Sequence, residues 1–196
     1  MPNKSSIPHV VLACPDPTGK LARETAASQE LDQVHQVLSR LVAETAIRLT
    51  DLRPGGGENM VQWLMPIKKA DRKSYHLLHM SGFEIAQNQI TLPTNKGTVQ
   101  EVPLAKFAAS LAKIPHLQMI ILSGMPAAEL TQELLKKGIP RVLVANESLQ
   151  SVGIMKEYYR ELVQGKTLQQ AYDQVQALVE DGQWPLYQLT YDAKQD

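Results

Sequence analysis

The sequence predicts an α/β fold: a three-layer α/β/α arrangement around a mostly parallel sheet of about six strands. Continuous apolar runs of strand length alternate along the 196 residues with segments of helical periodicity, as in parallel sheets covered on both faces. No linker, repeat or low-complexity tract divides the chain, so residues 1–196 are predicted to form one domain. The alternation is interrupted at residues 83–103, where three short runs predict a small antiparallel hairpin insertion added to the main sheet.

In the first half of the chain, three apolar or alternating runs predict strands. The run HVVLAC is closed by the breaker Pro-Asp-Pro, which is typical of the end of a buried strand. Apolar residues then recur at helical spacing from Ser28, a residue suited to capping a helix N-terminus. The elements predicted are strands at 9–14, 45–52 and 74–82, a helix from Ser28, and a short helix at 60–67.

The second half continues the alternation. Its most apolar segment, LQMIILSG, predicts a fully buried strand. Pro126 suits the first position of the next helix and Gly138 its end, and Thr167 with Gln170 fits a capping box. The elements predicted are helices at 104–113, 126–138, 151–164 and 167–180, and strands at 117–124, 140–146 and 185–191.

Composition excludes several classes of function. Twenty basic side chains balance twenty acidic ones, so no net field favours nucleic acid or an anionic membrane. The apolar runs are too short to span a bilayer or to form a signal peptide. A lone cysteine, Cys14, rules out an intramolecular disulfide and indicates a cytoplasmic setting. The histidines are scattered, so neither a metal nor a cofactor is predicted, and the glycine-rich segment RPGGGE lacks the pattern of a phosphate-binding loop.

Two stretches carry the functional interpretation: HLLHMSGFE at 76–84 and MIILSGMPAAE at 119–129. Each is an apolar run that stops at Ser-Gly and is followed by a large apolar residue, Phe83 or Met125. The carboxyl ends of parallel strands share one edge of a sheet, where ligands and catalytic groups collect. We therefore expect the positions after Cys14, Gly82 and Gly124 to lie at one edge.

These motifs resemble those of the CHAT domains, a bacterial branch of the caspase-like cysteine peptidases related to separases. The resemblance extends from Pro8 to Tyr191 and implies a caspase-like fold. In that family the third strand runs into His-x-Ser-Gly-His, which supplies the catalytic histidine. The segment HMSGF keeps His79, Ser81 and Gly82 of that motif, and Phe83 stands at the position of the catalytic histidine.

The second motif departs from the family in the same way. The family's fourth strand runs into Leu-x-x-Cys, and here the segment is LSGM, with Met125 at the position of the nucleophile. An acidic residue near the start of the helix after strand five helps members of the family to select a basic substrate; the corresponding position here is Glu147 or Ser148. Cysteine peptidases need a thiolate and a base, which phenylalanine and methionine do not provide.

The resemblance therefore implies a catalytically inactive domain, a pseudopeptidase. Its predicted role is to bind a protein partner, as an adaptor or regulator in a peptidase, defence or signalling complex, and its oligomeric state is left open. The predicted binding residues are Ser81, Gly82, Phe83, Gly124, Met125, Glu147 and Ser148. A second hypothesis is an active cysteine peptidase that uses Cys14 with His79 or His76. A third is a small-ligand pocket at the sheet edge, lined by Phe83 and Met125.

Several side-chain positions follow from the pattern. Strand alternation places His79, Ser81 and Phe83 on one face of the sheet. A histidine in a buried strand is more often a hydrogen-bonded core residue than a catalyst, and a lone cysteine such as Cys14 is usually a buried apolar residue. Phe83 and Met125 are predicted to be partly buried, with Phe83 the more exposed. Of the pair Tyr158 and Tyr159, one ring is predicted in the core and one at the surface.

Overall fold

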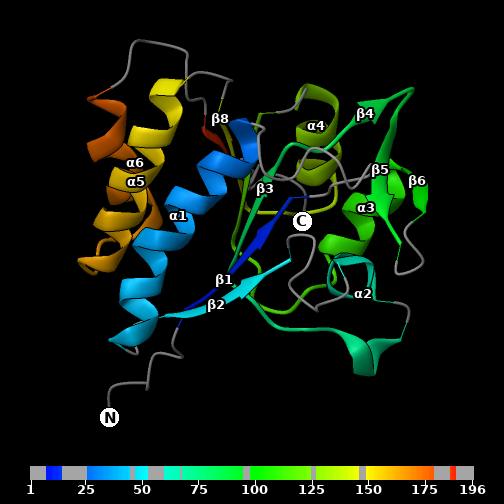
Figure 1. Ribbon diagram of the computed structural model, residues 1–196. Coiled ribbons are helices and arrows are strands. Elements are labelled where there is room, and N and C mark those ends of the chain that lie inside the picture. Colours follow the sequence, from blue (N-terminus) through cyan, green and yellow to red (C-terminus); the bar gives the residue numbers. More distant parts are fainter. Residues whose placement is uncertain are drawn as a thin grey trace, which may run out of the picture.

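A six-stranded sheet forms the centre of the molecule (Figure 1). The computed structural model describes residues 8–14, 26–44, 47–52, 60–66, 68–94, 98–124, 127–145, 149–178 and 186–188. The strand order is β2-β1-β3-β7-β8-β9. The strands are β1 (His9–Ala13), β2 (Arg48–Asp51), β3 (Leu77–Ser81), β7 (Met119–Ser123), β8 (Arg141–Ala145) and β9 (Leu186–Gln188). The first five are mutually parallel and β9 is antiparallel to β8, which confirms the predicted mostly parallel sheet.

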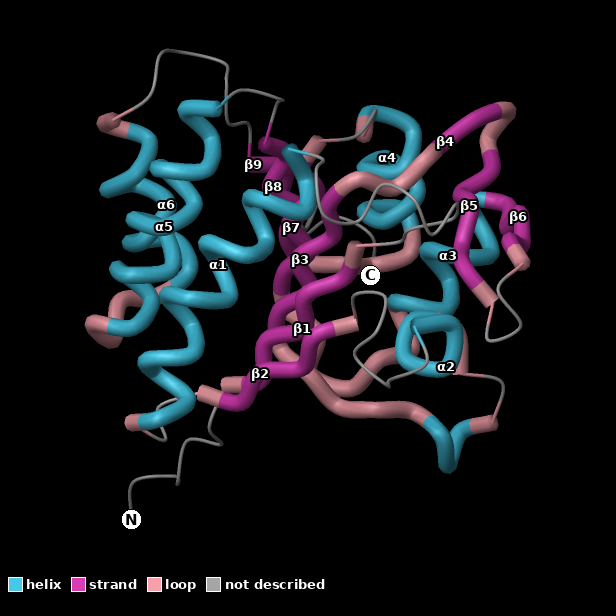
Figure 2. The backbone as a smooth tube through the Cα atoms, viewed as in Figure 1, coloured by secondary structure: helices cyan, strands magenta, loops and turns pink. Residues whose placement is uncertain are grey.

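Helices cover both faces of this sheet and make the three layers visible in Figure 2. Helices α1 (Ala26–Ala43), α5 (Leu149–Val163) and α6 (Leu168–Gln176) pack on one face. Helices α2 (Met60–Leu64), α3 (Leu104–Leu111) and α4 (Ala128–Lys136) pack on the other. Every residue of β3 and β7 is buried, because side chains on both sides of a central strand meet a helix layer. This two-sided burial is the reason that these strands read as continuous apolar runs.

The insertion between β3 and α3 forms a separate antiparallel sheet, with β4 (Ile85–Ala86), β5 (Gln89–Pro93) and β6 (Val99–Pro103) in the order β4-β5-β6. Gln87 and Asn88 have φ of 48° and 62° and make the two-residue turn between β4 and β5. The predicted insertion is present, but it does not extend the main sheet as expected. It forms a sheet of its own, and its buried side chains Ile90, Leu92 and Val102 pack into the core on the α2–α4 face.

Element boundaries differ from the prediction by a few residues. Helix α1 begins at Ala26, before Ser28, and α2 ends at Leu64. The capping box of α6 is confirmed: the amide of Gln170 donates to Oγ1 of Thr167 at 3.2 Å, and the amide of Thr167 donates to Oε1 of Gln170 at 3.0 Å. The segment RPGGGE and Pro126 lie outside the described residues. In the described part of the chain, no helix has the length and apolar character needed to cross a membrane.

Candidate functional site

The two Ser-Gly turns lie side by side at the carboxyl edge of the sheet. Strands β3 and β7 are parallel neighbours in a register that pairs Ser81 with Ser123, and the amide of Gly82 donates to the carbonyl of Ser123 at 3.2 Å. Gly82 and Gly124 have φ of 69° and 59°, a left-handed conformation that favours glycine. Since β1 is also parallel to β3, Cys14 follows its strand at the same edge, as predicted.

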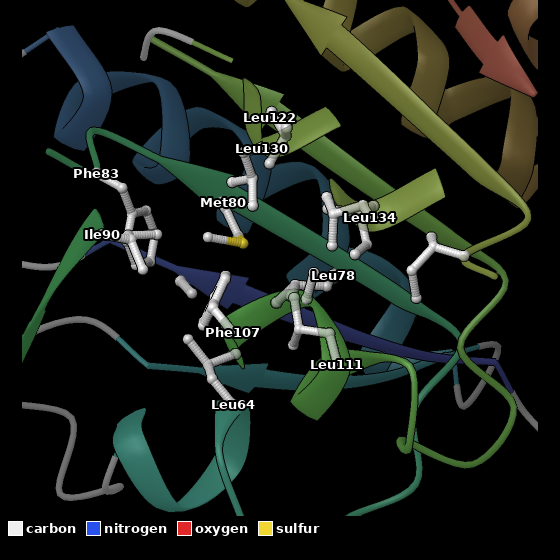
Figure 3. Close-up of a cluster of buried hydrophobic side chains, with 14 of the residues drawn as sticks. Leu64, Leu78, Met80, Phe83, Ile90, Phe107, Leu111, Leu122, Leu130 and Leu134 are labelled. Carbon is white, nitrogen blue, oxygen red and sulfur yellow. The ribbon is translucent and has the colours of Figure 1, made fainter. Parts of the chain in front are cut away.

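Phe83 is core rather than surface. Its side chain is only 2% exposed, and it belongs to the same apolar cluster as Met80, Ile90 and Phe107. In Figure 3 the ring points toward Ile90 of β5. The expectation that Phe83 is only partly buried is therefore wrong. Met125, with which its exposure was compared, lies outside the described residues, as do Glu147 and Ser148.

Phe83 also lies on the opposite face of the sheet from the one that alternation predicted. His79 and Ser81 face α1 and α5, whereas Phe83 packs with Leu78 and Met80 on the α2–α4 side. The reason is local: β3 ends at Ser81, and the left-handed backbone of Gly82 turns the chain out of the strand. Alternation of side chains holds only while the backbone stays extended.

On the α1–α5 side, His79 is the centre of a buried polar network. Its Nδ1 lies 3.1 Å from the hydroxyl of Tyr159 in α5, and its Nε2 lies 3.0 Å from Oγ of Ser123 in β7. The Ser123 hydroxyl donates in turn to the carbonyl of Met80 at 3.5 Å. Tyr159 and Ser123 therefore engage both ring nitrogens of His79.

Glu30 of α1 completes the network. It is 4% exposed, and its Oε2 accepts a hydrogen bond from the hydroxyl of Ser81 at 3.1 Å. Its Oε1 lies 3.3 Å from Nε2 of His79, within ion-pair distance, and has no hydrogen-bond partner among the described residues. Desolvation acts to raise the pKa of the Glu30 carboxyl, but His79 and the hydroxyls of Ser123 and Ser81 outweigh it, and the pKa is lowered.

The network contains a hydroxyl, an imidazole and a carboxylate, which are the groups of a nucleophile relay. A relay must also reach a substrate, and all of these side chains are buried: Glu30, His79, Ser81, Ser123 and Tyr159. The arrangement therefore holds α1 and α5 onto the sheet rather than presenting a reactive group. The prediction that His79 is a hydrogen-bonded core histidine is confirmed.

Cys14 lies on the same face of the sheet as His79. It is 6% exposed and packs in the cluster formed with α1 and α5, as expected of a buried apolar residue. The neighbouring Leu12 is opposite His79 in the β1–β3 register. Both ring nitrogens of His79, however, have partners in Tyr159 and Ser123. The imidazole therefore has no nitrogen available to take a proton from Cys14 in this conformation.

Three members of the network were not identified from the sequence. Glu30 carried a signal, since it lies four residues before Val34 and eight before Leu38 and so falls within the apolar stripe of its helix. Ser123 is a single hydroxyl at the end of an apolar run. Tyr158 and Tyr159 are both buried, which corrects the expectation of one surface ring: Tyr159 reaches His79, and Tyr158 donates to the sulfur of Met119 at 3.0 Å.

The described residues contain no group of three or more His, Cys, Asp and Glu side chains arranged to hold a metal ion. Comparison of the chain with protein-family models and with curated proteins yields no match.

Proposed function

We propose that this chain is a non-catalytic, CHAT-like domain of caspase-like fold that acts by binding a protein partner. The observation that carries the proposal is the burial of Phe83. The resemblance assigns that position to the catalytic histidine, and here it holds an apolar ring that packs in the core with Met80 and Ile90. A ring in that place contributes to the stability of the edge and has no proton to exchange.

The geometry of the edge supports the same proposal. The segments HMSGF and LSGM end neighbouring parallel strands, with Ser81 and Ser123 in register, so the positions that the resemblance assigns to the two reacting groups follow adjacent turns. Ser81 and Phe83 are buried, whereas Gly82 and Gly124 are partly exposed. A partner on this edge would therefore contact the two glycine turns and their exposed neighbours, such as Glu84, rather than the ring of Phe83.

The catalytic half of the proposal is tested by activity. The purified chain should not cleave peptide libraries with basic or acidic residues before the scissile bond. The variant Phe83→His with Met125→Cys should have little or no activity, because a dyad works only when it is held within a fraction of an ångström. Turnover by the parent chain that disappears in Cys14→Ser would contradict the proposal and support the peptidase hypothesis.

The binding half is tested by site-specific cross-linking in the native source. A photo-reactive side chain at the exposed Glu84 should capture a defined protein. The matched control is the same group at the exposed Lys137, at the end of α4 near the opposite edge of the sheet, which should not capture it. Equal capture from both positions, or none from Glu84, would contradict a docking site at the carboxyl edge.

A further inference from the structure

A cavity of about 700 Å³ lies at the amino edge of the main sheet, opposite the edge considered above. Its floor is formed by the first residues of three strands, His9, Leu77 and Arg141, and by Gln118 immediately before β7. The last residues of α5, the first residues of α6 and the C-terminal half of α1 enclose it. The apolar lining consists mainly of Val10, Leu38, Ile47, Leu162, Val163 and Leu168. This volume and lining are typical of small-molecule sites.

One charged side chain that lines this cavity has a buried hydrogen-bond donor without a partner among the described residues. Arg141, the first residue of β8, lines the cavity, and its buried Nε has no hydrogen-bond partner in the described part of the chain. A buried donor without a partner is costly, and more so when it is charged. A guanidinium is matched in shape by a carboxylate, which accepts two of its hydrogen bonds. Arg141 therefore favours an anionic group inside an otherwise apolar space.

The other polar groups around the cavity are also compatible with a bound anion. Lys166 forms an ion pair with Glu161. Burial lowers the pKa of both His9 and His76, so these imidazoles add little positive charge to the cavity at neutral pH. The first turn of α6, with its cap Thr167, also lines the cavity, and a helix N-terminus favours negative charge. None of the described lining residues carries a carboxylate.

We propose that this cavity binds an amphipathic monoanion, a carboxylate on an aliphatic chain. The carboxylate pairs with Arg141 near the first turn of α6, and the chain lies against Leu38, Leu162 and Val163. The proposal rests on the cavity and its charge, and it is independent of whether the opposite edge has lost catalysis.

The test compares three probes by isothermal titration calorimetry: decanoate, 1-decanol and acetate, with the amphiphiles below the concentrations at which they form micelles. Decanoate should bind saturably with one molecule per chain. Decanol, which has the chain without the charge, should bind at least about tenfold more weakly, since a hydrogen bond to a charged group is typically worth that much or more. Acetate should show no saturable binding. Absence of decanoate binding, or equal affinity for decanoate and decanol, would overturn the proposal.

Two variants locate the binding in this cavity. Arg141→Gln should weaken decanoate binding about tenfold or more and leave decanol binding nearly unchanged. The control is Arg160→Gln, which removes an exposed guanidinium that pairs with Glu157 on α5 and should bind like the parent. If Arg141→Gln does not fold, Val163→Trp provides a second test: it fills the cavity from the end of α5 and should weaken decanoate and decanol alike. Unchanged binding in either folded variant would overturn the assignment.

Discussion

The two faces of the main sheet are built by different physical means. The α2–α4 face is an apolar core in which Phe83, Met80 and Ile90 pack together. The α1–α5–α6 face holds apolar residues as well, but at its centre His79 joins Glu30 and Tyr159 through polar contacts. Both sets of side chains come partly from β3, which sends Leu78 and Met80 to one face and His79 and Ser81 to the other. The polar side chains of the strand are thus directed into a helix layer, where they contact Tyr159 and Glu30.

The difference shows that titratable side chains can serve packing as apolar ones do. His79 and the carboxylate of Glu30 lie 3.3 Å apart inside the protein, and the residue that follows the Gly82 turn is the buried phenyl ring of Phe83. Buried polar networks are stable only while every member keeps its partners, whereas an apolar cluster loses stability in proportion to the volume removed. The two faces should therefore respond differently to substitution.

The largest effect is expected on the apolar face. Phe83→Ala removes a side chain that is 2% exposed and should lower the free energy of unfolding by about 3–5 kcal/mol, the usual range for a buried phenylalanine. The measurement is urea denaturation followed by circular dichroism. The control Val99→Ala, at a residue that is 48% exposed, should change stability by about 0.5 kcal/mol or less. A loss for Phe83→Ala as small as that of the control would show that Phe83 is not a core residue.

On the polar face, Glu30→Ala should lower the free energy of unfolding by about 3 kcal/mol, because it leaves Ser81 and His79 without their carboxylate partner. Its exposed neighbour Asp32 provides the control Asp32→Ala, which should have a much smaller effect. Chemical denaturation at pH 7 measures both. Equal effects of the two substitutions would mean that the network does not stabilise the fold.

The same carboxyl predicts a pH dependence. Because the pKa of Glu30 is lower in the folded protein than its usual value of 4.5, the charged network stabilises the fold above that value. This contribution is lost as the pH falls through the folded pKa. The stability difference between the parent and Glu30→Gln should therefore shrink as the pH is lowered from 6 to below about 4. A difference that stays constant over this range would contradict the depressed pKa.

The adjacent tyrosines allow a finer comparison within the polar face. Tyr159→Phe removes the hydroxyl that contacts Nδ1 of His79 and should cost about 1–2 kcal/mol, the usual range for a lost buried hydrogen bond. Tyr158→Phe removes a hydroxyl that donates to the thioether of Met119, a weak acceptor, and should cost less. Thermal denaturation of the two variants measures the difference. A larger loss for Tyr158→Phe would show that His79 does not depend on the tyrosine.

The smallest effect is expected for Cys14, which is 6% exposed and packs among apolar residues. In the native protein its reaction with a thiol reagent such as DTNB should be slow, and it should become fast only in denaturant, because an inert buried thiol must be exposed before it reacts. Cys14→Ser should not alter any measured binding. Fast labelling of the native chain would identify an accessible thiolate and favour the peptidase hypothesis.

Much of the architecture was predictable from local pattern. The positions of the parallel strands, most helices and the α6 capping box could be read directly, because two-sided burial demands continuous apolar runs and helix ends demand particular residues. The neighbouring positions of the Ser-Gly turns of Gly82 and Gly124 also followed, since carboxyl ends of parallel strands meet at one edge. The exact helix ends did not follow, and neither did the packing of the insertion against the α2–α4 face instead of the edge of the main sheet. Tertiary packing decides both.

The sequence by itself determined the order and type of the elements, the α/β class and the apolar character of Phe83, all of which are properties of neighbouring residues. Only the tertiary structure decided that Phe83 faces the α2–α4 core, because the left-handed backbone of Gly82 ends the alternation of β3. It alone brought His79 to Tyr159, which is 80 residues away along the chain, and Ser81 to Glu30, which is 51 residues away. Contacts between such distant residues depend on how the helices pack across the sheet, and no local periodicity records that packing.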